Sequence, residues 1–330
     1  MGSVLLTILV LCLVVVYWMC LYDTNRFTVT EYTFEDDRIR RKCRAVVLAD
    51  LHNKQYGLNN QNLLDRIREL EPDLILVAGD LLTAHPREKL SRAERFLEQL
   101  VQIAPVYYGN GNHEHRLKLY PENYGALAQE YDAILKKYGV HLLVNQKVTL
   151  EACGISICGA EIDKHYYQRF TIPEMKDDYL PGLLGRPDEG YFQILLAHDP
   201  DFFPAYEKWG ADLILSGHVH GGIVRVPFYE KNPEFRSPET PAARRRRERK
   251  PGGQERDSQL PVSGPCWRLK GMLSPNVRFF PKYDGGCFVR GRSAMIVSRG
   301  LGVHTLPFRF LNPGELIRID FCPEENAHAD

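Results

Sequence analysis

Short apolar runs that end in histidine or acidic residues recur along this chain and constrain its fold more than any other feature. One run, residues 211–215, leads into Gly217-His218-Val219-His220-Gly221. A buried run of this length, bounded by glycine, predicts a strand covered on both faces. Residues i and i+2 of an extended segment project to the same side, so His218 and His220 can reach one point. This arrangement suits a metal site, although a solvated pair of loop histidines has the same spacing.

Four more apolar runs end in a similar way. The residues that follow them are Asp50 and His52, then Asp80, then Asn112, His113 and Glu114, and finally His198. Segments with helical periodicity alternate with the first three runs, and this order is typical of a parallel α/β sheet. Ligands bind beyond the carboxyl ends of strands in such sheets, so we expect these side chains to converge.

The expected cluster offers oxygen and imidazole donors without cysteine. Such donors suit manganese, iron or zinc, and there are too many of them for one ion. We therefore expect two divalent or transition metal ions, roughly 3.5–4 Å apart as in two-metal hydrolases. The eight cysteines include no Cys-x-x-Cys pair, which argues against both a disulfide framework and a zinc–thiolate site.

The N-terminus contains an uncharged apolar segment, residues 4–22. It is about long enough to cross a bilayer as a helix. It lacks the basic n-region and the small-residue cleavage site of a secretory signal. We therefore predict a single-pass anchor over residues 1–26 and a catalytic domain over residues 27–330. Lys and Arg follow this segment and none precedes it, so the positive-inside rule favours a cytoplasmic catalytic domain at the cell membrane.

Residues 229–265 differ in composition from the rest of the chain. They are rich in proline, glycine and charge, and they include a basic run at 244–250. Such a segment cannot bury a core, so we predict a disordered surface insertion. Across the whole chain 42 basic residues balance 42 acidic ones, which gives no electrostatic reason to expect nucleic-acid binding. The sequence gives no oligomeric state.

Local signals predict the individual elements. Strands are expected at 27–34, 45–49, 74–78 and 192–197, and antiparallel pairing is expected from residue 140 onward. Asn60 is expected to cap one helix, and Ser91 with Glu94 has the spacing of a capping box for the next. The polar, aromatic-rich stretch 161–189 lacks a clear period and is expected to form a loop over the site.

The order of these motifs resembles that of the calcineurin-like metallophosphoesterase superfamily. The matching segments are residues 49–52, 197–200, 216–222 and 298–302. Within that superfamily the chain looks most similar to a membrane-anchored subgroup that includes UDP-diacylglucosamine pyrophosphohydrolases. The resemblance implies an α/β fold in which two mixed sheets pack as a sandwich flanked by helices, preceded here by one transmembrane helix.

The resemblance also implies a role for each site residue. One metal ion would be held by Asp50, His52 and His220. The other would be held by Asn112, His198 and His218. Asp80 would bridge the two ions. His113 would protonate the leaving oxygen or stabilise the transition state, and Glu114 would orient His113.

Three functions remain open from the sequence. The leading hypothesis is a dinuclear-metal phosphoesterase in which a metal-activated hydroxide attacks a phosphodiester or pyrophosphate bond of a lipid-linked or UDP-linked substrate. The second is a broad-specificity phosphodiesterase or monoesterase whose anchor serves only location. The third is a non-catalytic metal-binding scaffold that keeps the same fold.

Overall fold

The computed structural model describes residues 2–168, 171–231, 262–263, 267–275, 278–303 and 306–324. Most of the segment expected to be an insertion, residues 232–261 and 264–265, lies outside this range. Its two described ends are paired strand and not irregular loop, because residues 229–231 belong to one strand and residues 262–263 form another.

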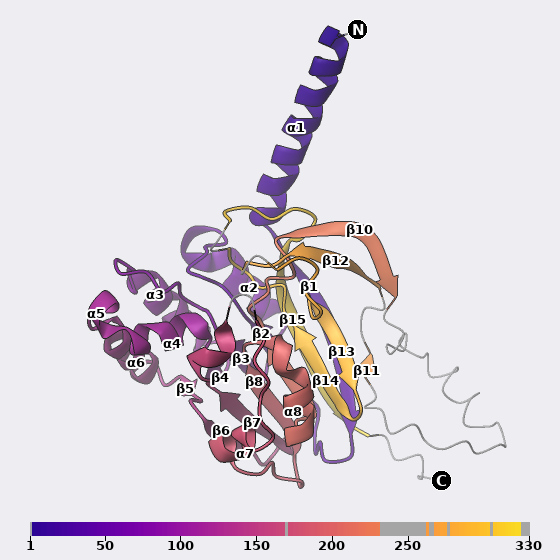
Figure 1. The fold of residues 1–330 in the computed structure, drawn as a ribbon. Coiled ribbons are helices and arrows are strands. Elements are labelled where there is room, and N and C mark those ends of the chain that lie inside the picture. Colours follow the sequence, from indigo (N-terminus) through magenta and orange to yellow (C-terminus); the bar gives the residue numbers. More distant parts are fainter. Residues whose placement is uncertain are drawn as a thin grey trace, which may run out of the picture.

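Two mixed sheets pack face to face, as predicted (Figure 1). The seven-stranded sheet has the order β11 (Val262–Ser263), β1 (Phe27–Asp36), β15 (Gly314–Pro323), β2 (Cys43–Leu48), β3 (Leu74–Ala78), β4 (Val106–Gly109) and β5 (His141–Leu142). Strands β2 to β5 run parallel, β15 runs antiparallel to β2, and β1 runs parallel to β15.

The second sheet has six strands. Their order is β13 (Gly286–Arg290), β14 (Ser293–Val297), β9 (Leu213–Ser216), β8 (Phe192–Ala197), β7 (Ile155–Ala160) and β6 (Gln146–Leu150). The four central strands are parallel, and β6 and β13 close the edges in antiparallel pairs. A separate antiparallel hairpin joins β10 (Val224–Lys231) to β12 (Trp267–Leu273).

Helices cover the outer faces of both sheets. They are α2 (Gln61–Glu69), α3 (Ser91–Leu100), α4 (Asn112–Leu119), α5 (Pro121–Tyr124), α6 (Leu127–Lys137), α7 (Tyr179–Leu184) and α8 (Phe203–Trp209). Short 3-10 turns are η1 (Leu58–Asn60), η2 (Lys164–Tyr167) and η3 (Pro200–Phe202). The helix α1 (Gly2–Thr24) projects away from the body of the molecule, and it is long and apolar enough to cross a membrane (Figure 1).

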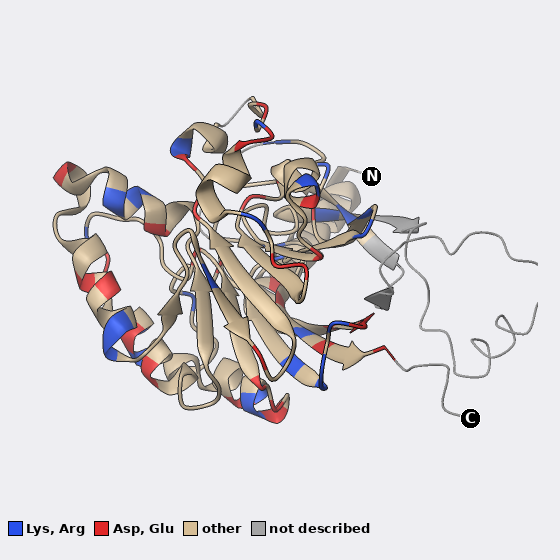
Figure 2. Ribbon diagram, turned by 90° about the horizontal axis from the view of Figure 1, so that it is seen from below, with Lys and Arg blue, Asp and Glu red and all other residues tan. Residues whose placement is uncertain are grey.

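Successive residues of the central strands point in turn into two different hydrophobic cores. In β3, Leu74 and Leu76 face the core between the sheets, whereas Ile75 and Val77 face the helices α2, α3 and α6. A third cluster packs α7 and α8 against the six-stranded sheet. The strands are therefore buried on both faces, which is why they read as continuous apolar runs. Charged residues gather instead on the outer helices and loops (Figure 2).

Three local predictions differ from the structure. Asn60 stands before α2, but its side chain accepts a hydrogen bond from the Tyr56 amide and does not cap the helix. Ser91 is the first residue of α3 and makes no capping hydrogen bond. Glu94 instead accepts hydrogen bonds from Lys137 and Tyr138. The stretch 161–189 contains η2 and α7 and is not loop throughout.

Candidate metal centre

The residues selected from the sequence meet between the two sheets, just beyond the carboxyl ends of five strands. Asp50 and His52 follow β2, and Asp80 follows β3. Asn112, His113 and Glu114 form the first turn of α4, which follows β4. His198 follows β8, and His218 and His220 follow β9. Seven of these nine side chains belong to buried residues, whereas Asn112 and His218 are partly exposed.

One group consists of Asp50, His52 and His220. The Nε2 atoms of the two histidines lie 3.2 Å apart. The Oδ1 atom of Asp50 lies 3.4 Å from His220 Nε2 and 4.0 Å from His52 Nε2. Two ligand atoms on one ion, each about 2.0–2.1 Å from it, lie roughly 3–3.4 Å apart. The close pairs in this group therefore have the spacing of ligands that share an ion.

A second group surrounds His198 and His218. The Oδ1 atom of Asn112 lies 2.8 Å from Nδ1 of His218, and Oδ2 of Asp80 lies 3.1 Å from Nε2 of His198. The same Asp80 oxygen lies 3.8 Å from His52 Nε2, so it faces both groups. The other oxygen, Oδ1, accepts a hydrogen bond from the backbone amide of His113. A bridging role for Asp80 would therefore fall mainly to one of its oxygens.

The histidines are oriented by hydrogen bonds on the side away from the cluster. Nδ1 of His198 lies 2.7 Å from the Ala78 carbonyl, and Nδ1 of His220 lies 3.2 Å from the Gly302 carbonyl. A carbonyl accepts only, so Nδ1 carries the proton in each ring and a neutral ring directs the lone pair of Nε2 into the cluster. The buried Nε2 of His198 makes no hydrogen bond of acceptable geometry. An inward lone pair of this kind fits a bound cation.

Backbone strain is concentrated at the same residues. Positive φ angles occur at Asp50, His52, Asp80, His218 and His220. Non-glycine residues rarely adopt this conformation, and it persists where the surrounding structure enforces it. Here it turns each side chain back toward the other strand ends.

Two glycines allow the carboxylates to sit close to the backbone. A Cβ atom on Gly111 would lie 2.1 Å from Oδ1 of Asp80, and a Cβ atom on Gly217 would lie 2.5 Å from Oδ2 of Asp50. Both contacts are shorter than any van der Waals separation. The glycines that precede Asn112 and His218 are therefore required by packing against the acidic donors.

The electrostatics of the protein alone favour a cation at this position. Burial raises the pKa of Asp50 to about 7. Burial also acts to raise the pKa of Asp80, but His198 and His113 lower it well below its usual range. For His198, burial acts to lower the pKa, but Asp80 and then Asp50 raise it to about 10. Even without a metal ion, the cluster therefore holds one positive charge, the added proton of His198, beside its two carboxylates.

His113 and Glu114 have different surroundings. The Ala84 amide donates to Nδ1 of His113, and Nε2 of the same ring lies 4.0 Å from Oδ2 of Asp80. The Glu114 carboxylate accepts hydrogen bonds from the amides of Asp80, Leu81, Leu82 and Gly111 and from the Tyr108 hydroxyl. These bonds hold the Asp80 loop against α4, so the described contacts give Glu114 a wider positioning role than the orientation of His113.

Comparison with known proteins identifies the family. Residues 43–222, which carry every one of these side chains, match the calcineurin-like phosphoesterase family. This chain is a calcineurin-like phosphoesterase. It is therefore a metal-dependent phosphoester hydrolase, and the superfamily predicted from the sequence motifs is confirmed.

Relatives of this phosphoesterase come from bacteria and animals. "Uncharacterized protein YpbG" of Bacillus subtilis is 30% identical over 59% of this chain and 68% of its own length. "Uncharacterized metallophosphoesterase YkoQ" of the same organism is 27% identical over 67% of this chain and 79% of its own. The zebrafish "Transmembrane protein with metallophosphoesterase domain" is 30% identical over 54% of this chain, but only 40% of its own length is matched.

Several residues that support the phosphoesterase site had no assigned role in the sequence. Oδ2 of Asp199 lies 4.0 Å from Nε2 of His218, and the Tyr167 ring lies 5.4 Å from the His218 ring. The buried Arg309 donates to the carbonyls of Gly300 and Gly302. Asp199 and the two glycines belong to segments that matched the superfamily, so a signal for them existed. Nothing in the sequence pattern distinguishes Tyr167 or Arg309 from other aromatic and basic residues.

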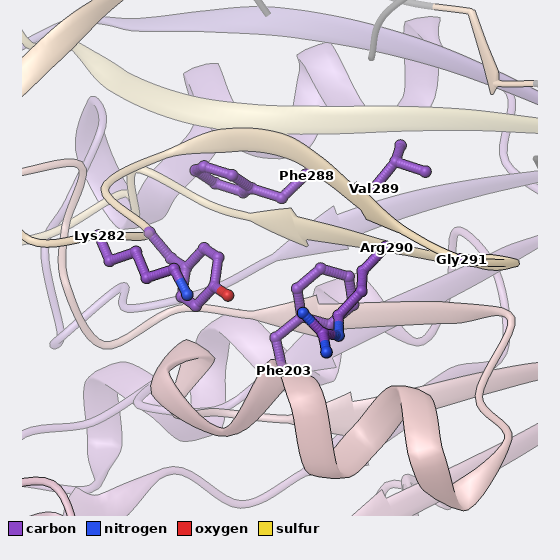
Figure 3. A pocket seen from close by; sticks show the side chains of 7 residues that line it. Phe203, Lys282, Phe288, Val289, Arg290 and Gly291 are labelled. Carbon is purple, nitrogen blue, oxygen red and sulfur yellow. The ribbon is translucent and has the colours of Figure 1, made fainter. Parts of the chain in front are cut away.

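A pocket of 420 Å³ lies elsewhere on the phosphoesterase, between α8 and the β13–β14 hairpin (Figure 3). Phe203, Lys282, Phe288 and Arg290 are among the residues that line it. Arg290 is paired with Glu207 at 2.7 Å. The described lining includes none of the strand-end donors, so this pocket is separate from the metal centre.

Proposed function

We propose that this phosphoesterase hydrolyses a phosphodiester or pyrophosphate bond at a centre of two metal ions. The observation that supports it most directly is the convergence of seven donor side chains at five strand ends, with the buried His198 Nε2 left without a hydrogen bond. Oxygen and imidazole donors suit manganese, iron or zinc. When bound, such ions polarise phosphoryl oxygens and activate water.

The donors would divide between the two ions as the two groups divide. Asp50, His52 and His220 would hold one ion, and Asn112, His198 and His218 would hold the other. Asp80 would bridge them, since its Oδ2 faces both groups. Asn112 contributes an amide oxygen, which adds a ligand without adding charge.

His113 would act on the leaving group. Its Nδ1 accepts a hydrogen bond from the Ala84 amide, so a neutral His113 ring carries its proton on Nε2. That nitrogen faces the cluster. From there it can donate the proton to the oxygen that leaves phosphorus, or stabilise negative charge on it. Glu114 would support this step indirectly, because it fixes the loop that carries Asp80.

The anchor supports the substrate class that we propose. Helix α1 is apolar and exposed over most of its length, and a zebrafish relative is described as a transmembrane protein. We infer a single-pass protein of the cell membrane, with residues 1–26 as its anchor and the catalytic domain on the cytoplasmic side. A lipid-linked or UDP-linked phosphate ester fits an enzyme held at that surface.

The experiment that tests this function measures metal content and hydrolysis together. Purified full-length protein in detergent is loaded with Mn²⁺, Fe²⁺ or Zn²⁺ and assayed against aryl phosphodiesters, nucleotides and UDP-linked lipids. We expect one class of ester to be hydrolysed, in a metal-dependent way, at a rate well above the rates for the other classes. Similar rates on every ester would favour the broad-specificity alternative, and no metal-dependent hydrolysis of any ester would contradict the proposal.

A further inference from the structure

The end of α1 is built into the catalytic domain and is not joined to it by a loose linker. Asp23 and Thr24, its last two residues, are buried. The hydroxyl of Thr24 accepts a hydrogen bond from the Arg309 amide at 2.9 Å, and the side chain of Asn25 accepts one from Lys54 at 2.9 Å. These bonds fix the direction in which the helix leaves the domain, so the domain has a defined face toward any bilayer that α1 enters.

The strand register shows which face this is. Phe27 pairs with Gly314 in the β1–β15 ladder, and Val47 pairs with Ile317 in the antiparallel β15–β2 ladder. If the β15–β2 ladder is continued by three residues from this pair, Asp50 comes to lie about opposite Gly314. Asp50 is therefore at about the same height along the sheet as Phe27, the partner of Gly314. Phe27 follows Thr24 by three positions, so this level lies within about 11 Å of the helix end. The metal centre thus lies at the end of the sheet from which α1 rises (Figure 1).

A short chain of contacts joins the helix end to the metal donors. Arg309, whose amide binds Thr24, donates through its guanidinium to the carbonyls of Gly300 and Gly302. The Gly302 carbonyl also faces Nδ1 of His220. A Cβ atom on Gly300 would lie 2.7 Å from that of Asp50. The loop beneath the anchor and the loops that carry the donors are therefore one packed unit.

The surface beside the anchor has the composition of a membrane-contacting face. Leu58 is 83% exposed, and it lies two residues after Tyr56, whose ring packs on Phe27 at 4.9 Å. Pro307 is exposed two residues before Arg309. Lys54 stands at the helix end with its amine bonded to Asn25. Apolar tips beside basic groups are typical of segments that rest in the headgroup layer.

We propose that the metal-bearing edge of the seven-stranded sheet faces the bilayer that α1 enters. The loops that carry Leu58 and Pro307 then rest in the headgroup layer of this bilayer. The metal centre acts on the phosphate of an amphiphile whose apolar chains stay in the same bilayer. The proposal rests on the phosphoesterase function proposed above and specifies its substrate class. A soluble ester could reach the same centre, but it would gain nothing from the orientation that the anchor imposes.

The test uses full-length protein in phosphatidylcholine vesicles and two diesters with the same leaving group. One is methyl p-nitrophenyl phosphate, which is soluble, and the other is dioleoylglyceryl p-nitrophenyl phosphate, which stays in the bilayer. Leu58→Asp places a charge on the proposed contact face. Ala152→Asp is the matched control, because Ala152 is an exposed residue of the β6–β7 turn, at the amino end of β7 and opposite the metal edge.

We expect wild-type protein to hydrolyse the lipid diester at least about tenfold faster than the soluble one at equal bulk concentration, since both partners are confined to one surface. Leu58→Asp should lower the lipid rate several-fold while the soluble rate and metal content stay within twofold of wild type. Ala152→Asp should change neither rate.

Equal lipid rates for Leu58→Asp and Ala152→Asp would overturn the contact face, and a wild-type preference for the soluble diester would overturn the substrate class. Absence of hydrolysis of both diesters would instead contradict the phosphoesterase function itself.

Discussion

Asp80 and Asp50 differ in the role that we propose for their carboxylates, and this difference gives a prediction for single residues. Both carboxylates lie near a histidine of each group: Oδ2 of Asp80 is 3.1 Å from His198 and 3.8 Å from His52, and Oδ1 of Asp50 is 3.4 Å from His220 and 3.7 Å from His198. Only Asp80 is proposed to bind both ions. We expect Asp80→Asn to lower kcat about tenfold further than Asp50→Asn and to lose more metal, because it weakens both ions and their spacing. Steady-state kinetics and elemental analysis of the two variants provide the check. Equal metal content and equal rates would argue against a bridging Asp80.

His113 is predicted to matter for turnover and not for metal affinity. Its ring is held by the Ala84 amide, and its Nε2 lies 4.0 Å from Oδ2 of Asp80 at the edge of the cluster. His113→Ala should keep metal content near wild type while kcat falls by about 10²–10⁴-fold, the usual range for a general acid. The loss should shrink for esters with good leaving groups, which need no proton. A variant that loses its metal would show that His113 is a ligand.

At the scale of single elements, the ion pair between the partly exposed Arg299 and the buried Glu315 supports the loop beneath the candidate metal centre. Glu315 accepts hydrogen bonds from the Arg299 amide and from Thr30, and its carboxylate lies 3.1 Å from the Arg299 guanidinium. Burial acts to raise the pKa of Glu315, but Arg299 lowers it below its usual value. A carboxyl with a lowered folded pKa stabilises the fold above its unfolded pKa of about 4.3, and this stabilisation is lost as pH falls through the folded value.

Glu315→Gln should therefore destabilise the protein by about 1.5–3 kcal/mol at pH 7, because it leaves the partly exposed Arg299 without its partner charge. The difference from wild type should shrink below about pH 4. Thermal unfolding in detergent across this pH range gives the measurement. Glu31→Gln is the control: Glu31 is an exposed partner of Arg318, so its loss should cost at most about 1 kcal/mol. Equal destabilisation by the two variants would contradict a supporting role for the pair of Arg299 and Glu315.

The elements most accurately predicted from sequence are those whose signals are local. The apolar run 74–78 coincides with β3, and the amphipathic pattern after residue 91 coincides with α3. Where prediction failed, distant partners decided the outcome. Glu94 has capping-box spacing, yet Lys137 and Tyr138 from the region of α6 bind its carboxylate. No sequence spacing encodes such a contact.

The candidate metal donors illustrate the same division. Their convergence was predictable, because apolar strands that end in His, Asp and Asn form a recognisable order. Their orientation was not, since it depends on positive φ angles at five of them and on distant carbonyls of Ala78 and Gly302. Arg309 escaped notice because a buried arginine has the same sequence appearance as an exposed one.

At the scale of the whole molecule, the contacts at the boundary between anchor and domain predict how truncation changes the stability of the protein. A chain beginning at Asp23 keeps the Asp23–Arg26 ion pair and the bond from Arg309 to Thr24, whereas a chain beginning at Phe27 loses both. We expect the shorter chain to be less stable by about 1–3 kcal/mol, mainly because the buried Arg309 amide loses its acceptor. Thermal unfolding of the two truncated proteins is the measurement. Both should hydrolyse a small diester, since every proposed donor lies after residue 49. Equal unfolding temperatures would show that the last turn of α1 adds nothing to the domain.

We propose that two metal ions at the strand ends carry out the hydrolysis. To test this, all metal is chelated from the full-length protein and Mn²⁺ is titrated back, while the bound metal and the rate of diester hydrolysis are measured together. We expect the activity of the wild type to be lost on chelation, to return as metal binds and to saturate at two ions per chain, whereas Asp80→Asn should fail to reach that stoichiometry. Hydrolysis that survives chelation, or full activity with two bound ions in Asp80→Asn, would contradict the proposal.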